Sequence, residues 1–152
     1  MNNFQKKFPY LFLIKVINQK TKDISDYYLL RDGINTSLGM MLGQINCSKQ
    51  SKSLINRKHL ESKLKIAGSS VTHSLNRLEK NGCIIRTSNQ RDNRNIDVTI
   101  TEHGEKLLTN IDSALKKAND CLVLNMTENE KRMFFNLLER SLENLESFEK
   151  EQ

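Results

Sequence analysis

Donor-rich side chains cluster between residues 69 and 80, at a spacing that would place them along one side of a helix. Val71, Leu75 and Leu78 recur every three to four residues and predict the side that faces a core. The other side and its flanks carry small or hydrogen-bonding side chains, with no acid before Glu79: Ser69, Ser70, Thr72, His73, Asn76, Arg77 and Lys80. A helix face that is only solvated usually carries more Glu and Lys, so this composition favours a specific partner.

The chemistry of this face matches the edges of base pairs. Asn76 suits adenine, and Arg77 suits guanine or a phosphate, because each presents hydrogen-bonding groups at the spacing of a base edge. Ser69 and Ser70 would stand at the helix N-terminus, where unpaired backbone N–H groups favour a phosphate. We therefore predict a recognition helix for the major groove of DNA.

A β-hairpin is predicted after this helix, because the period of the apolar residues changes from helical to alternating. Isoleucine and valine alternate with polar residues over 96–100, and a short extended run covers 84–87, with a polar tip between them. Arg91 and Arg94 in that tip suit a narrow minor groove, where the negative potential is enhanced. Asp92 lies two residues before Arg94 and is placed to brace it.

The positive charge of the chain is concentrated around these two features. Residues 49–94 hold eleven basic and three acidic side chains, a net charge of +8, whereas the rest of the chain is at −2. A segment with this bias is attracted to a polyanion through counterion release, and the attraction weakens with salt. A solvated basic surface would have the same charge, so the charge by itself supports DNA binding only weakly.

The elements that would position the recognition helix are mainly helical. We expect a first helix over 4–30, interrupted at Pro9 and ended by Gly33, and a second that begins near Asn35 and ends before a polar loop over 48–53. A short third helix is capped by Asn56, and a fifth begins at about Thr101. A capping box of Thr127 with Glu130 begins the last helix.

Residues 69–82 and 92–104 resemble the MarR family of winged helix-turn-helix transcription regulators. That family's wing has an Asp-x-Arg, then a strand that ends in an apolar-Thr pair, then a glycine three residues on. The matching residues here are Asp92, Arg94, Ile100, Thr101 and Gly104. The resemblance covers nearly the whole chain and implies a mainly α fold with a small β-hairpin wing.

The resemblance implies a homodimer that straddles a pseudo-palindromic site in double-stranded DNA. The long apolar helices support this independently, because they carry more apolar surface than one small core needs. We expect one domain over 1–152, with a winged helix-turn-helix core at about 35–101 and dimerisation helices at about 4–31 and 103–149. Two recognition helices would read half-sites ~34 Å apart.

The resemblance also implies a repressor whose DNA affinity is lowered by a small lipophilic or phenolic effector. The segment Pro9-Tyr10-Leu11-Phe12 is similar to repressors of multidrug efflux pumps. Met and aromatic side chains adapt to varied apolar ligands. The candidates to line a ligand cleft are Phe12, Tyr28, Met40 and Met41, although a place in the core explains each of them as well.

Other functions remain open at this point. Cys83, at the start of the wing, or Cys47 would serve a thiol-based redox sensor, but such sensors in this family usually carry their cysteine in the first helix, where this chain has none. A winged helix used for RNA or protein contacts would respond differently to salt.

The sequence excludes other classes more firmly. Three cysteines and three histidines show no metal-ligand spacing, and no nucleophile–base pair or phosphate loop indicates an enzyme, so no cofactor is expected. The longest apolar run is too short to cross a membrane, and we expect a cytoplasmic protein.

Overall fold

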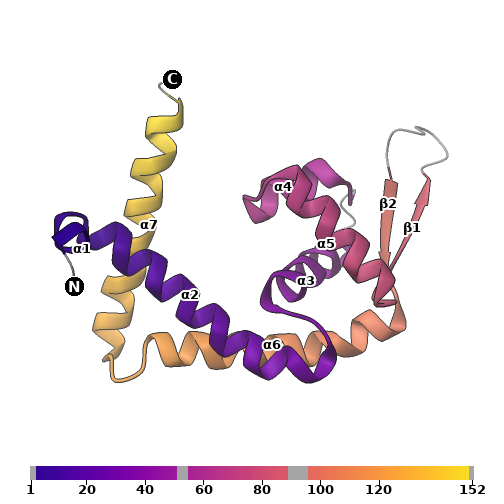
Figure 1. The fold of residues 1–152 in the computed structure, drawn as a ribbon, viewed down its shortest axis with the longest axis horizontal. Helices are drawn as coiled ribbons and strands as arrows, with labels where there is room; N and C mark the ends of the chain where they lie inside the picture. Colours follow the sequence, from indigo (N-terminus) through magenta and orange to yellow (C-terminus); the bar gives the residue numbers. More distant parts are fainter. Residues whose placement is uncertain (1–2, 51–54, 89–95, 151–152) are drawn as a thin grey trace. The chain divides into compact units, whose positions relative to one another are not determined.

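The computed structural model describes residues 3–50, 55–88 and 96–150 (Figure 1). It confirms the predicted fold class, mainly helical with a two-stranded antiparallel hairpin. The elements in chain order are α1 (Asn3–Lys7), α2 (Pro9–Leu29), a 3₁₀ turn (Leu30–Asp32), α3 (Thr36–Gln50), α4 (Arg57–Leu64), α5 (Gly68–Lys80), β1 (Ile84–Ser88), β2 (Ile96–Ile100), α6 (Glu102–Leu122) and α7 (Glu128–Lys150). The chain divides into two compact units, Met1–Ala118 and Asn119–Gln152.

The ends of the first helices follow from local chemistry, as predicted. Pro9 is the first residue of α2, where its fixed φ suits a helix and its missing N–H costs nothing. Gly33 adopts φ 67° and ends the 3₁₀ turn that follows α2, a conformation that glycine adopts without steric cost. The side chain of Asn35 then accepts a hydrogen bond from the backbone N–H of Leu38 at 3.0 Å, at the start of α3.

The predicted loop over 48–53 is wrong for its first three residues, because α3 continues to Gln50. Ser48 is buried, and its hydroxyl donates to the Gln44 carbonyl at 2.9 Å. The same oxygen lies 3.0 Å from Nε2 of His59 in α4. The polar side chain finds its partners inside the fold, so a polar sequence does not end the helix here.

The core of the N-terminal unit lies among α3, α4, α5, the hairpin and the first half of α6. Its fully buried side chains include Met41 and Ile45 of α3, Leu60 of α4 and Leu78 of α5. The hairpin adds Ile84, Val98 and Ile100, and α6 adds Leu107 and Ile111. Figure 1 shows α3, α4 and α5 grouped beside the hairpin, so one shared core orients the predicted recognition helix and the wing.

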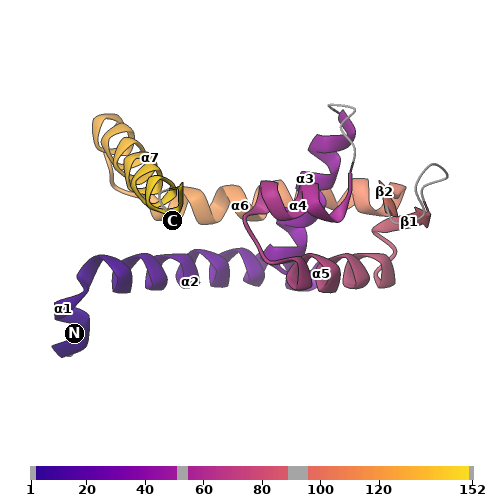
Figure 2. The ribbon, with the colours of Figure 1, turned by 90° about the horizontal axis from the view of Figure 1, so that it is seen from above.

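Hydrogen bonds tie this core to α2 and α6. Asp26 of α2 accepts from the backbone N–H and the hydroxyl of Thr36, both at 2.5 Å, at the start of α3. Asn110 of α6 donates to the carboxylate of Asp32 at 3.2 and 3.3 Å. Figure 2 shows α2 and α6 running in opposite directions. The turn between α2 and α3 is therefore attached to both long helices of this unit.

The capping box at the start of α7 is confirmed. The Glu130 carboxylate accepts from the backbone N–H of Thr127 at 2.7 Å, and the Thr127 hydroxyl accepts from the Glu130 N–H at 3.3 Å. The Thr127 hydroxyl also donates to this carboxylate, at 2.8 Å. The two hydrogen bonds that the carboxylate accepts from Thr127 favour its ionised form and lower the pKa of Glu130.

Thr127→Ala is expected to destabilise α7 by about 1 kcal/mol, because the cap is lost. The wild-type advantage should be full above the ordinary pKa of a glutamate and should fall as the pH drops through the lowered pKa of Glu130. Thermal unfolding of both proteins, followed by circular dichroism across acidic pH, measures the difference. An advantage that stayed constant with pH would contradict the role of Glu130.

Candidate nucleic-acid interface

Helix α5 presents the predicted division between a buried and an exposed side. Val71, Leu75 and Leu78 are buried against α3, α4 and the hairpin. The side chains that the sequence assigned to the DNA-facing side are all exposed: Ser69, Ser70, Thr72, His73, Asn76 and Arg77. The only acid in α5 is Glu79, in its last turn. The exposed side of the helix is therefore rich in hydrogen-bond donors and free of acid over its first three turns.

The N-terminus of α5 is uncapped by any side chain, so first-turn N–H groups remain for a partner, as expected. It differs from the expectation in having a carboxylate beside it. The Glu61 carboxylate of α4 lies against Gly68, close enough that an added Cβ would overlap its Oε1. Glu61 also pairs with Arg57, with Nε and Oε1 2.9 Å apart. A carboxylate thus already lies beside the helix end that was expected to bind a phosphate.

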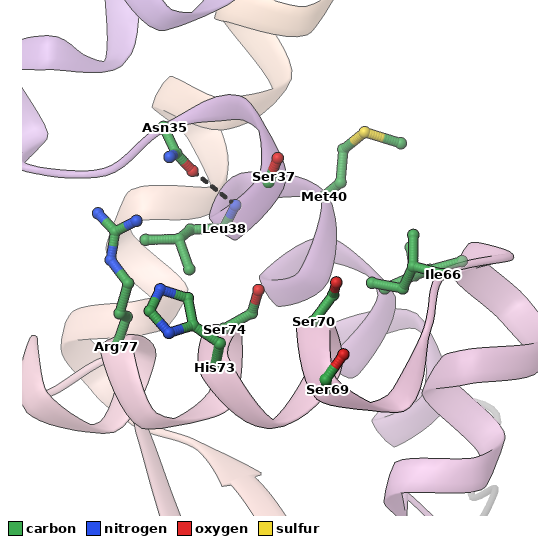
Figure 3. A pocket seen from close by; sticks show the side chains of 11 residues that line it. Asn35, Ser37, Leu38, Met40, Ile66, Ser69, Ser70, His73, Ser74 and Arg77 are labelled. Carbon is green, nitrogen blue, oxygen red and sulfur yellow. Dashed lines mark hydrogen bonds between the residues drawn. The ribbon is translucent and has the colours of Figure 1, made fainter.

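A cleft of about 530 Å³ opens along α5 (Figure 3). Its lining residues come from α3, from α5 and from the end of α4 with the turn after it: Asn35, Ser37, Leu38, Met40, Leu64, Ile66, Ser69, Ser70, His73, Ser74 and Arg77. Figure 3 shows Arg77 and His73 near one end, and Met40 and Ile66 near the other. The cleft therefore combines an apolar part with donors that belong to the predicted DNA-reading face.

The hairpin forms as predicted, with Ile84 opposite Ile100 and Arg86 opposite Val98. The predicted tip residues Arg91, Asp92 and Arg94 lie outside the described residues. Below the tip, Arg86 donates to the Glu79 carboxylate of α5, from Nε at 2.9 Å and from Nη2. These hydrogen bonds lower the pKa of Glu79. In the sequence these two residues stand out only as charges, because nothing in their spacing marks a pair across a turn.

Ion pairs neutralise some of the basic side chains of residues 49–94. Both acids of the described part of this segment pair within it, Glu61 with Arg57 and Glu79 with Arg86. Lys49 pairs with Glu105 of α6 at 2.7 Å. Because each acid is neutralised by a neighbouring base, neither leaves an isolated negative charge beside the donor-rich face.

The four residues suggested for a ligand site do not gather in one place. Met40 is half exposed and lines the cleft along α5. Met41 is fully buried in the core and has no surface to offer a ligand. Phe12 and Tyr28 belong to α2, and Tyr28 lies under Lys117, whose Nζ is 4.0 Å from the ring centroid. The four were chosen for their residue types, because Met and aromatic side chains suit apolar ligands, and a residue type does not distinguish the core from a cleft.

The cysteines differ in accessibility. Cys47 and Cys121 are exposed, whereas Cys83, the last residue of the turn between α5 and β1, is fully buried. Burial raises the pKa of the Cys83 thiol, so its reactive thiolate form is suppressed. This environment is the opposite of the one that a sensing cysteine needs.

A thiol-specific reagent is expected to label Cys47 and Cys121 in the folded protein and to leave Cys83 unmodified until the chain unfolds. Mass spectrometry of digested, labelled protein measures this. Peroxide treatment of a Cys47→Ser, Cys121→Ser variant should then leave DNA affinity unchanged. Rapid labelling of Cys83 in the folded protein would instead support a redox role for that cysteine, and a loss of DNA affinity on peroxide treatment of the wild type alone would support one for Cys47 or Cys121.

Within the described residues, no group of three or more His, Cys, Asp or Glu side chains is arranged to hold a metal ion. Nor is any helix in that part of the chain long and apolar enough to cross a membrane.

A mainly helical chain with an exposed donor face on α5 and a hairpin beside it is a winged helix-turn-helix protein. The family model described as transcriptional regulator SarA/Rot matches residues 36–111, which is half of the chain. The chain belongs to this family of transcriptional regulators. No curated protein sequence matches the chain.

Solved structures give the same class, and the expected resemblance to the MarR family is confirmed. A putative MarR family regulator from Listeria monocytogenes, complexed with DNA, is 25% identical, with a TM-score of 0.75 over 89% of this chain and 87% of that one. Wild-type apo MarR from E. coli is also 25% identical, with a TM-score of 0.69 over 89% and 97%. MepR of S. aureus in a DNA complex is 24% identical and matches in fold, with a TM-score of 0.80 over 91% and 98%.

Proposed function

We propose that the protein is a homodimeric repressor that binds a pseudo-palindromic site in double-stranded DNA and releases it when a small lipophilic or phenolic effector binds. The observation that carries the proposal is the exposed, donor-rich face of α5 within a segment of net charge +8. Family membership supports the regulatory role. We also propose a cytoplasmic location, because a transcription regulator must reach the DNA that it binds.

Each contact of the proposed interface has a distinct role. Asn76 and Arg77 read base edges in the major groove, with Thr72 and His73 beside them. Ser69 and Ser70 approach a phosphate at the start of α5. The wing residues Arg91 and Arg94, with Asp92 as a brace, enter the flanking minor groove, so Arg94→Ala should weaken binding broadly and reduce a flanking A·T preference.

Dimerisation is supported by apolar side chains that neither unit buries. In the N-terminal unit, α2 exposes Tyr10, Leu11, Leu13 and Ile14. In the C-terminal unit, α7 exposes Met133, Phe135, Leu137, Leu138, Leu142, Leu145 and Phe148. Apolar surface of this extent is typical of a protein–protein interface. We propose that the helices at about 4–31 and 103–149 form the dimer, and that the core at about 35–101 binds DNA.

The effector is proposed to bind in the cleft along α5. Leu38, Met40 and Ile66 supply apolar contacts there, and His73 and Arg77 supply polar ones. His73 and Arg77 also belong to the proposed DNA-reading face, so a ligand bound in the cleft would occupy side chains that DNA binding needs. Of the four residues suggested from the sequence, the proposed ligand site includes Met40 but not Phe12, Tyr28 or Met41.

Selection of bound duplexes from a random pool tests the function. The expected result is a pseudo-palindrome with half-sites one helical turn apart, bound by a dimer whose affinity falls steeply with salt. RNA or protein binding would give no enriched duplex. Affinity that did not change with salt would contradict DNA binding.

A further inference from the structure

Besides the core that they share, α5 and the hairpin are joined by polar contacts in two places, and the first is the turn between them. The N–H of Cys83 donates to the Leu78 carbonyl at 2.9 Å, and the N–H of Thr101 donates to the Cys83 carbonyl at 3.0 Å. The Thr101 hydroxyl donates to the Gly82 carbonyl at 2.6 Å. These contacts fix the base of the hairpin, and the buried Ile84, Val98 and Ile100 pack its inner side into the core. A side-chain contact between α5 and the strand itself adds to both.

The second attachment is the ion pair between Glu79 and Arg86. Alternation along β1 places Arg86 on the same side as the buried Ile84, while Ile85 between them is exposed. Val98, the cross-strand partner of Arg86, is buried too. Arg86 therefore lies on the inner side of the hairpin, and two of its nitrogens donate to one oxygen of Glu79. This contact joins the last turn of α5 to the middle of the strand.

The ion pair engages two charged groups, Arg86 and Glu79, that would otherwise attract or repel the phosphates of DNA. The Arg86 side chain is only 22% exposed, and its guanidinium is engaged by Glu79, so it is poorly placed to contact a phosphate. Glu79 is the only acid of α5, and the pair neutralises it on the helix that approaches a polyanion. The geometry therefore assigns Arg86 to the internal support of the hairpin.

We infer that Glu79 and Arg86 are positioning residues for DNA binding, whose ion pair fixes the angle of the wing so that it reaches the minor groove while α5 occupies the major groove. The inference rests on the proposed function. It predicts that the pair is coupled energetically to the wing arginines, although it touches no DNA itself.

A double-mutant cycle measures this coupling. In the wild type, replacing Arg91 and Arg94 together by alanine should weaken binding to a mixed-sequence duplex about tenfold or more at low salt. In Glu79→Gln or Arg86→Gln proteins, the same replacement should cost less than about threefold, because the wing is already misplaced. The charge-swapped variant Glu79→Arg, Arg86→Glu should restore most of the loss. An equal cost in every background overturns the inference.

Amide hydrogen exchange without DNA supplies the second measurement. The Gln variants should exchange faster in β1 and β2 with little change in α5, and the swapped variant should return towards the wild-type rate. Glu128→Gln is the matched control, because it breaks an ion pair with Lys131 within α7, outside the winged helix-turn-helix core. Unchanged hairpin exchange overturns the inference. A wild-type chain that binds no duplex overturns the proposed function instead, and the exchange rates distinguish that failure.

Discussion

Arg77→Ala and Asn76→Ala are each expected to abolish the preference for one base pair in both half-sites of the selected DNA. A bidentate contact between such a side chain and a base contributes about 1–3 kcal/mol of discrimination. Both residues are exposed on α5, whose other side is held in the core by Val71, Leu75 and Leu78, so truncation should leave the fold intact. Affinity for random duplex should change far less than affinity for the selected site.

Repeating the selection with each variant, and measuring affinity by fluorescence anisotropy, tests this expectation. Lys80→Ala is a suitable control, because Lys80 lies exposed at the end of the same helix. A lysine that contacts only phosphate should weaken binding to all sequences alike and reduce the salt slope by about one. If Asn76→Ala and Arg77→Ala behaved like this control, α5 would not be the reading helix.

Gly104→Ala is expected to destabilise the protein by about 1–3 kcal/mol, a loss typical of overpacking. A Cβ at this position would overlap the carbonyl oxygen of Cys83 and approach Cγ1 of Ile100 to 2.8 Å. The Cys83 oxygen also accepts the N–H of Thr101, so it cannot move freely. Because these contacts join α6 to the base of the hairpin, the wing should be displaced and DNA affinity should fall.

Gly43→Ala is the matched control with the opposite sign. Gly43 lies inside α3, and no heavy atom of the residues that the structure describes comes within 4 Å of an added Cβ. Alanine should stabilise the helix there by up to about 1 kcal/mol. Thermal unfolding of the two variants measures the contrast, with about 2–4 °C expected per kcal/mol in a chain of this size. Equal melting temperatures would show that the close approach at Gly104 is relaxed at no cost.

Features of short range were predictable from the sequence. Asn56 caps α4, Thr101 accepts from Gly104 near the start of α6, and Thr127 forms the capping box of α7, because each side chain bonds a backbone group three residues away. The two strands of the hairpin and the buried side of α5 also followed, since alternation and helical periodicity depend only on neighbours. The donor-rich face opposite that buried side was predictable for the same reason.

Features that join distant parts of the chain were not predictable in this way. The length of α3 was underestimated because Ser48 finds a partner in His59 of another helix. Met40 and Met41 are adjacent in sequence, yet one lines the cleft and the other fills the core. No local pattern distinguishes them, because the difference depends on which elements pack against each side of α3.

The sequence by itself determined that a donor-rich helix and a hairpin stand next to each other in a basic segment, because periodicity and charge are properties of neighbouring residues. Only the tertiary structure decided how the two are held. The Glu79–Arg86 pair and the close approach of Gly104 to Cys83 bring together groups from different elements. Such contacts depend on the three-dimensional path of the backbone, and that path fixes the wing relative to the helix it serves.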